Sequence, residues 1–184
     1  MSSVSPCPGI LNIKPHMIEV TLAETGQGQL INVSSNESAL GPSPSAVAAA
    51  KVATENMERY PENASGTLAD KIGEIFSLDP TRITCGPGSA DLLARIARAY
   101  ATPGSELIYS VNGYQNFSNF AYANDAKPVA APDNEFRADI QSILDCVTDQ
   151  TRVVMLANPD NPTGSYISGQ EVRQLREGLP QNAL

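Results

Sequence analysis

The sequence predicts an α/β fold, in which a mainly parallel sheet is covered by helices on both faces. From about residue 44 onward, short apolar runs alternate with segments that carry apolar residues at helical spacing, which is the order of strands and helices in parallel sheets. One of these runs, Val153 to Leu156, is continuously apolar, as expected for a strand that is buried on both faces. The chain has 184 residues, of which 41% are hydrophobic and 17% charged, so it can form one domain with a core.

The first part of the chain is expected to be an arm that precedes this domain. Residues 1–43 are rich in Ser, Pro and Gly, which are residues of turns and irregular segments. Only one strand is expected there, around Leu30 to Val33. The boundary is therefore predicted between residues 43 and 44, and residues 44–184 are assigned to the large domain.

Helices are predicted from caps and from periodicity. Ser43 and Pro44 have the residue types of a helix cap and a first helical residue, and the Ala-rich run that follows extends the helix to Met57. Apolar residues over 68–76 predict a second helix, which ends before Asp79-Pro80. Later helices are expected over residues 92–100, 117–121, 140–147 and 172–179.

Strands are predicted where short apolar runs are enriched in β-branched residues. These runs are Arg82–Cys85, Glu106–Ser110, Lys127–Ala131 and Arg152–Ala157.

Composition excludes several classes of function. The net charge of −8 and the pI near 4.6 argue against nucleic-acid and membrane partners, because both need clustered Lys and Arg. No stretch approaches the roughly 20 apolar residues of a membrane span, and Met1 to Pro8 does not have the pattern of a secretory signal. A cytoplasmic location is therefore expected. The cysteines have no CxxC spacing, and His16 is the single histidine, so no metal site is expected.

Three loops that follow predicted strands are the places to look for a ligand, because ligands of parallel sheets bind at the carboxyl ends of the strands. The first is Cys85 to Ala90. Its glycines allow close approach of the backbone, and the helix that follows offers free N–H groups, which suit a phosphate. A tight turn with Ser89 as the helix cap explains the same residues.

The second loop, Val111 to Tyr114, places an aromatic ring where it could lie against a flat heterocycle, although an ordinary core or surface tyrosine is the simpler explanation. The third loop, Asn158 to Gly164, contains two prolines and two asparagines and is predicted to be a rigid turn that presents amide side chains.

The order Asn-Pro-Asp-Asn-Pro-Thr-Gly at residues 158–164 strongly resembles the fold-type I aminotransferases that depend on pyridoxal 5'-phosphate (PLP). The resemblance extends over most of the chain. Residues 35–44, Ser-Asn-Glu-Ser-Ala-Leu-Gly-Pro-Ser-Pro, and residues 59–62, Arg-Tyr-Pro-Glu, resemble segments of histidinol-phosphate aminotransferases in particular. The resemblance therefore implies that residues 44–184 are the first part of a PLP-binding large domain.

The resemblance implies a set of cofactor contacts. Ser89 and Ala90 would bind the cofactor phosphate through their backbone N–H groups, Tyr114 would stack on the pyridine ring, and Asn161 would donate a hydrogen bond to its phenolic oxygen. Pro87 departs from the family pattern and removes one N–H donor from the loop.

The resemblance also implies a partner subunit and substrates. Tyr60 would reach the cofactor phosphate of the neighbouring subunit, which implies a homodimer, and Asn36 would lie on the substrate side. The substrates would be a small amino donor, such as a phosphorylated amino alcohol or amino acid, and a 2-oxo acid such as 2-oxoglutarate.

The Schiff-base lysine of the family is expected to be missing, so that no catalytic residue is assigned. The lysines of the chain, Lys14, Lys51, Lys71 and Lys127, do not match its position in the family. Because transamination needs a lysine amine to move a proton, we expect a truncated form that does not transaminate by itself.

The sequence leaves two alternatives open and disfavours a third. A PLP-dependent decarboxylase would have the same fold, and a non-catalytic fragment would associate with another chain. A dinucleotide-binding protein is disfavoured, because residues 86–91 lack the third Gly of its motif.

Overall fold

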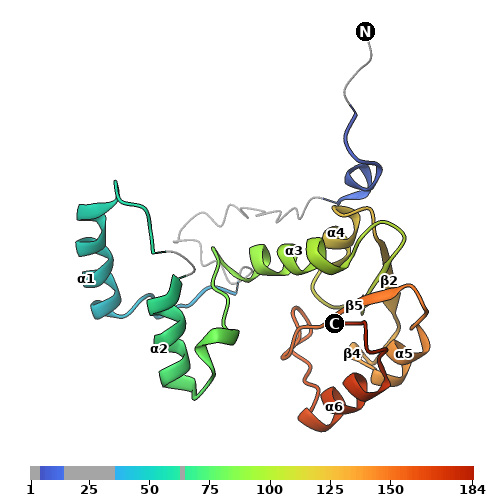
Figure 1. Ribbon diagram of the computed structural model, residues 1–184. Helices are drawn as coiled ribbons and strands as arrows, with labels where there is room; N and C mark the ends of the chain where they lie inside the picture. The colour runs from blue at the N-terminus through green and yellow to red at the C-terminus, as the bar shows by residue number, and fades with distance from the viewer. Residues whose placement is uncertain (1–4, 15–35, 63–64) are drawn as a thin grey trace, which may run out of the picture. The chain divides into compact units, whose positions relative to one another are not determined.

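The computed structural model describes residues 5–14, 36–62 and 65–184, and the chain divides into two compact units (Figure 1). The first unit combines Met1–Met17 with Gly86–Leu184, and the second is Ile18–Cys85. The strand predicted at Leu30 to Val33 lies outside the described residues. The boundary predicted between residues 43 and 44 stays a prediction.

A three-stranded parallel sheet is the centre of the first unit, with the strand order β2-β1-β5. A two-residue antiparallel pair, β3 with β4, follows β2 and was not predicted. The strands are β1 (Glu106–Ser110), β2 (Lys127–Ala131), β3 (Asp133–Asn134), β4 (Arg137–Ala138) and β5 (Thr151–Met155). The predicted bounds of β1 and β2 are confirmed, and β5 agrees with its prediction to within two residues.

Helices cover both faces of this sheet, as predicted. Figure 1 shows α3 and α4 on one side of the strands and α5 and α6 on the other. Their bounds are α3 (Ser89–Tyr100), α4 (Asn116–Tyr122), α5 (Ile140–Asp145) and α6 (Gly169–Gly178). Successive side chains of a strand point to opposite faces, so Leu107 and Val153 join one buried cluster, whereas Ile108 and Val154 contact the other.

A network of hydrogen bonds fixes the start of α6. Ser168 Oγ accepts from the backbone N–H of Glu171, and the Glu171 carboxylate accepts from the backbone N–H of Ser168 at 2.7 Å, which forms a capping box. Arg137 Nη2 donates to Glu171 Oε1 at 2.6 Å, and Arg137 Nε donates to the carbonyl of Tyr166. Arg137 thereby connects the β3–β4 pair to α6.

The N-terminal segment of the first unit contains a short 3-10 helix, η1 (Pro8–Asn12), that contacts α4. The backbone N–H of Gly9 donates to Asp125 Oδ1 at 2.7 Å. A Cβ atom at Gly9 would lie 2.1 Å from the carbonyl oxygen of Tyr122, so this close approach requires glycine. A part of the predicted arm is therefore packed against the large domain.

The second unit contains α1 (Pro44–Ala53), η2 (Thr54–Asn56), α2 (Gly66–Phe76) and η4 (Pro80–Arg82). Ser43 Oγ accepts from Ala46 N at 3.2 Å, so the predicted cap of α1 is confirmed. The strand predicted at Arg82–Cys85 is wrong. Residues 80–82 form η4, which Asp79 caps. No described segment pairs with residues 83–85, and an extended segment without a neighbouring strand forms no β-ladder.

Among residues 5–14, 36–62 and 65–184, no helix is both long and apolar enough to cross a bilayer. In the same residues, no group of three or more His, Cys, Asp or Glu side chains is arranged to bind a metal ion.

We expect the contribution of Glu171 to stability to depend on pH. The hydrogen bond from Arg137, followed by those from Ser168, lowers the pKa of Glu171 from 4.5 to about 2. A carboxylate with a lowered pKa stabilises the folded state above its unfolded pKa, and this contribution is lost as the pH falls from about 4.5 toward 2. Urea unfolding should show that Glu171→Gln is less stable than wild type at neutral pH, by a difference that is constant down to about pH 5 and then narrows.

Glu177→Gln is the matched control, because Glu177 lies exposed on the same helix. It should change the unfolding free energy little at any pH. If the difference in unfolding free energy between wild type and Glu171→Gln does not become smaller in acid, the lowered pKa of Glu171 is contradicted.

Candidate functional site

Two loops of the first unit are adjacent at the carboxyl edge of its sheet, and the topology places the start of α3 at the same edge. Because β1 and β5 are parallel, the loops that follow them leave from the same edge. A Cβ atom at Gly113, after β1, would lie 3.4 Å from Asp160 Oδ1, after β5, which shows that the two loops are adjacent. A short turn joins α3 to β1, so α3 runs back across the sheet and begins at this edge.

The start of α3 presents backbone N–H groups without acceptors. The N-cap is Gly88, with φ 102° and ψ 163° and no side-chain cap, a conformation that favours glycine. Among the described residues, no acceptor meets the N–H groups of Ser89, Ala90 and Asp91. Ser89 and Ala90 are exposed. These groups and the positive end of the helix dipole suit an anion such as a phosphate.

The alternative in which Ser89 is the helix cap is wrong. Ser89 is the first helical residue and not the cap, since the cap is Gly88. Pro87 lies before the helix, and Gly88 N donates to Gly86 O at 2.8 Å around it. Its missing N–H therefore removes no donor from the first turn of α3.

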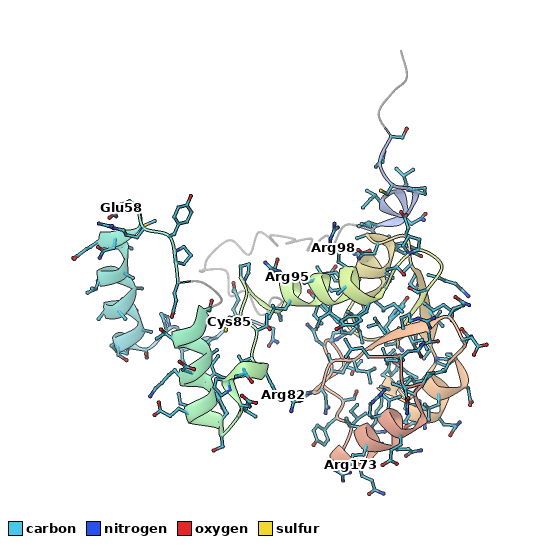
Figure 2. The ribbon with its side chains drawn as sticks, in the orientation of Figure 1. Glu58, Arg82, Cys85, Arg95, Arg98 and Arg173 are labelled. Atoms are coloured by element: carbon cyan, nitrogen blue, oxygen red, sulfur yellow. The ribbon has the colours of Figure 1, made fainter. Side chains whose placement is uncertain are left out.

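Arg95 balances a negative charge near the start of α3. Asp91 Oδ2 lies 2.7 Å from Arg95 Nε, one turn further along the helix. Figure 2 labels Arg95 and Arg98 on α3. The ion pair reduces the repulsion that Asp91 would exert on an anion at the helix start.

The loop after β1 is held by a carboxylate from β3. Asp133 Oδ1 accepts from the hydroxyl of Ser110 at 2.5 Å, and Asp133 Oδ2 accepts from the backbone N–H and from Nδ2 of Asn112 at 3.3 and 3.1 Å. Val111 N donates to Ala131 O at the end of β2. The backbone that leads to Tyr114 is therefore fixed from both sides.

Tyr114 is partly buried and its ring is oriented by two neighbours. Its ring packs edge-on against Phe117, with centroids 5.4 Å apart and an interplanar angle of 86°. Its hydroxyl accepts from Asn116 Nδ2 at 2.9 Å. The ring is thus held at the edge of the site.

The loop Asn158 to Gly164 uses its two asparagines differently. Asn158 Nδ2 donates to Ile167 O at 2.9 Å, and Asn158 Oδ1 accepts from Ile167 N at 3.1 Å. Asn158 therefore closes the loop. The side chain of Asn161 is exposed and has no hydrogen-bond partner among the described residues, so its amide is free for a ligand.

Further bonds inside this loop make it rigid. Thr163 Oγ1 donates to Asp160 Oδ2 at 2.8 Å, and Asp160 N donates to Ser165 O at 2.8 Å. The peptide bonds that precede Pro159 and Pro162 are cis. The hydrogen bonds of Asn158, Asp160 and Thr163 occupy the other polar side chains of the loop that presents Asn161.

Four of the expected site residues, Ser89, Ala90, Tyr114 and Asn161, belong to segments that meet at this edge. Tyr60 and Asn36 belong to the second unit. Tyr60 is fully exposed, and Asn36 is exposed with φ 53°. The roles expected for these six residues stay predictions.

Sequence reasoning missed the residues that support the site. No role was expected for Asp133 or Asn116. The position of Asp133, two residues after the strand Lys127–Ala131, was a usable signal, because polar side chains at such positions lie near ligand sites in parallel sheets.

Comparison with known proteins shows the family of the chain. The family model described as aminotransferase class I and II matches residues 28–184. Histidinol-phosphate aminotransferases of Paramagnetospirillum magneticum and of Rhodopseudomonas palustris strain TIE-1 are 42% and 43% identical to the chain over 184 and 185 aligned residues. The chain spans about half the length of these curated relatives.

Solved structures have the same fold. The histidinol-phosphate aminotransferase of Sinorhizobium meliloti, solved in complex with pyridoxal 5'-phosphate, matches 100% of this chain and 50% of its own, with a TM-score of 0.85 and 26% identity. The aspartate aminotransferase of Rhizobium meliloti matches 72% of the chain and 36% of its own, with a TM-score of 0.64 and 26% identity. The chain belongs to the aminotransferase class I and II family, with the fold of the fold-type I PLP aminotransferases.

Proposed function

We propose that the first unit binds PLP at the carboxyl edge of its sheet, and that the chain provides cofactor-binding elements of an aminotransferase of the histidinol-phosphate type. Support comes from the relatives, which are named histidinol-phosphate aminotransferases, and from the S. meliloti structure that contains PLP. These names favour amino transfer over the decarboxylation that the same fold would allow.

The observation that carries the proposal is the combination of free donors around Tyr114. At the start of α3 the N–H groups of Ser89 and Ala90 have no acceptor among the described residues, and they would hold the phosphate of PLP. The amide of Asn161 is free on the adjacent loop and would donate to the phenolic oxygen. Both ends of the cofactor thus have matching donors.

These residues bind and orient, and PLP when bound supplies the electron sink for the substrate. We assign proton transfer to none of the described lysines. Lys127 begins β2 at the opposite edge of the sheet and donates to Glu106 at 2.8 Å, whereas Lys71 pairs with Glu74 at 2.8 Å.

The proposal extends to assembly and substrates. The exposed side chain of Tyr60 would contact the phosphate of the neighbouring subunit in a homodimer, and Asn36 would face the substrate. A phosphorylated amino donor and a 2-oxo acid would be the substrates, as the names of the relatives support.

Asn161→Ala is expected to weaken PLP binding about tenfold, because it removes a hydrogen bond to a charged oxygen. Equilibrium dialysis of PLP against the 184-residue chain measures this change. Asn182→Ala is the matched control, since Asn182 is exposed and lies beyond α6, where the chain pairs with Arg152 near the start of β5. Equal affinity for wild type and Asn161→Ala would contradict the role of Asn161.

The phosphate contact can be tested at the start of α3. Ser89→Pro removes the backbone N–H and keeps the helix start, because proline is favoured at a first helical position, whereas Ser89→Ala keeps the N–H. We expect Ser89→Pro to bind PLP about tenfold more weakly than Ser89→Ala. Pyridoxal, which lacks the phosphate, should bind both variants equally. A similar loss for pyridoxal would show that the substitution distorts the site and that the N–H is not the cause.

A further inference from the structure

A chain of hydrogen bonds connects the N-terminal segment of the first unit to Tyr114. Asn116 Nδ2 donates to the Tyr114 hydroxyl at 2.9 Å, and Asn119 Nδ2 donates to Asn116 Oδ1 at 3.1 Å. Asn119 also binds the backbone of Lys14 in both directions, through Nδ2 to Lys14 O at 3.0 Å and through Oδ1 from Lys14 N at 3.3 Å. Both N–H bonds of the Asn119 amide are therefore used.

The helix α4 gives this chain its geometry. Asn116 and Asn119 are three residues apart, so their side chains lie on the same face of the helix. Phe117, between them in sequence, is 3% exposed and anchors α4 in the core, and its ring also packs against Tyr114. The position of the Tyr114 ring thus depends on Phe117 at its edge and on Asn116 at its hydroxyl.

The N-terminal segment is held at two points on the same helical region. Gly9 N donates to Asp125 Oδ1 just beyond α4, and Lys14 is held by Asn119. The contact at Gly9 permits no side chain, because a Cβ atom would collide with Tyr122 O. Two independent anchors fix residues 9–14 against α4.

We propose that Asn116 and Asn119 are positioning residues that couple the docked N-terminal segment to the ring of Tyr114, so that docking of Lys14 sets the orientation of the ring for the cofactor. This inference rests on the proposed function, in which Tyr114 stacks on PLP. Since the Tyr114 hydroxyl accepts from Asn116, its own proton stays available for a second acceptor.

Amide hydrogen exchange tests the coupling without the cofactor. Exchange at Lys14 N should be slowed in wild type and should become about threefold faster or more in Asn119→Ala, which removes its acceptor. Tyr114→Phe removes only the hydroxyl. If the chain of hydrogen bonds couples Tyr114 to Lys14, this variant should also accelerate exchange at Lys14 N, because coupling between two positions is reciprocal. Exchange at Gly9 N, held by Asp125, should change in neither variant.

Asn124→Ala is the matched control for this measurement. Asn124 follows α4 and its Nδ2 donates to Phe120 O at 2.8 Å, so it touches neither Lys14 nor Tyr114 in this network. Two results would overturn the coupling. One is an unprotected Lys14 amide in wild type, and the other is a Lys14 exchange rate that is the same in wild type and in Tyr114→Phe.

Induced circular dichroism of bound PLP tests the effect on the cofactor, because this signal reports how the pyridine ring is held. Asn119→Ala should change the signal and weaken PLP binding about threefold, whereas Asn124→Ala should do neither. In a Tyr114→Phe background, Asn119→Ala should have no further effect, because both substitutions break the same chain. Additive effects would overturn the inference.

The two proposals fail in different ways. If wild type binds no PLP, the proposed function and the cofactor part of this inference both fail, while hydrogen exchange decides the coupling by itself. If PLP binds with the expected dependence on Ser89 and Asn161 but Asn119→Ala leaves the dichroism unchanged, this inference alone fails.

Discussion

Burial of β1 on both faces is the constraint on which the rest of the first unit depends. Leu107 and Ile108 are both 0% exposed and point to opposite sides, and β1 also pairs with a parallel strand on each edge. A strand so enclosed has one direction and one register, because a slip by one residue would exchange its two faces. The carboxyl ends of β1 and β5 are therefore fixed at a common edge, where the loops that contain Tyr114 and Asn161 meet.

At the carboxyl edge of the sheet, a few polar groups without partners lie among polar side chains that are hydrogen-bonded within the protein. Most polar side chains there are already satisfied within the protein, as Asp133 is by Ser110 and Asn112, and this makes the loops rigid. Asn161 and the first N–H groups of α3 remain without partners in the described residues. Rigid presentation lowers the entropy cost of binding a ligand, so in the proposed function the occupied groups help by holding the free donors in place.

Sequence patterns predicted the parts that depend on local chemistry. The strands β1 and β2 have the predicted bounds, because their short apolar runs lie between turn residues that end each strand. Arg82–Cys85 failed because a strand also needs a partner, which no local pattern reveals. The two asparagines of the 158–164 loop could not be told apart either. Only the hydrogen bonds from Asn158 to Ile167 show which one is structural.

The amino edge of the sheet is held by an ion pair and lies opposite the proposed cofactor site. At the amino edge, Glu106 is 7% exposed, and hydrogen bonds from Lys127 and then Thr148 lower its pKa. Lys127 is thus committed to an ion pair at the edge opposite Tyr114 and Asn161. Because the strands are parallel, no small rearrangement brings its amine to the other edge. In the proposed function, the described residues at the carboxyl edge therefore orient the cofactor, and Lys127 does not supply the amine that amino transfer requires.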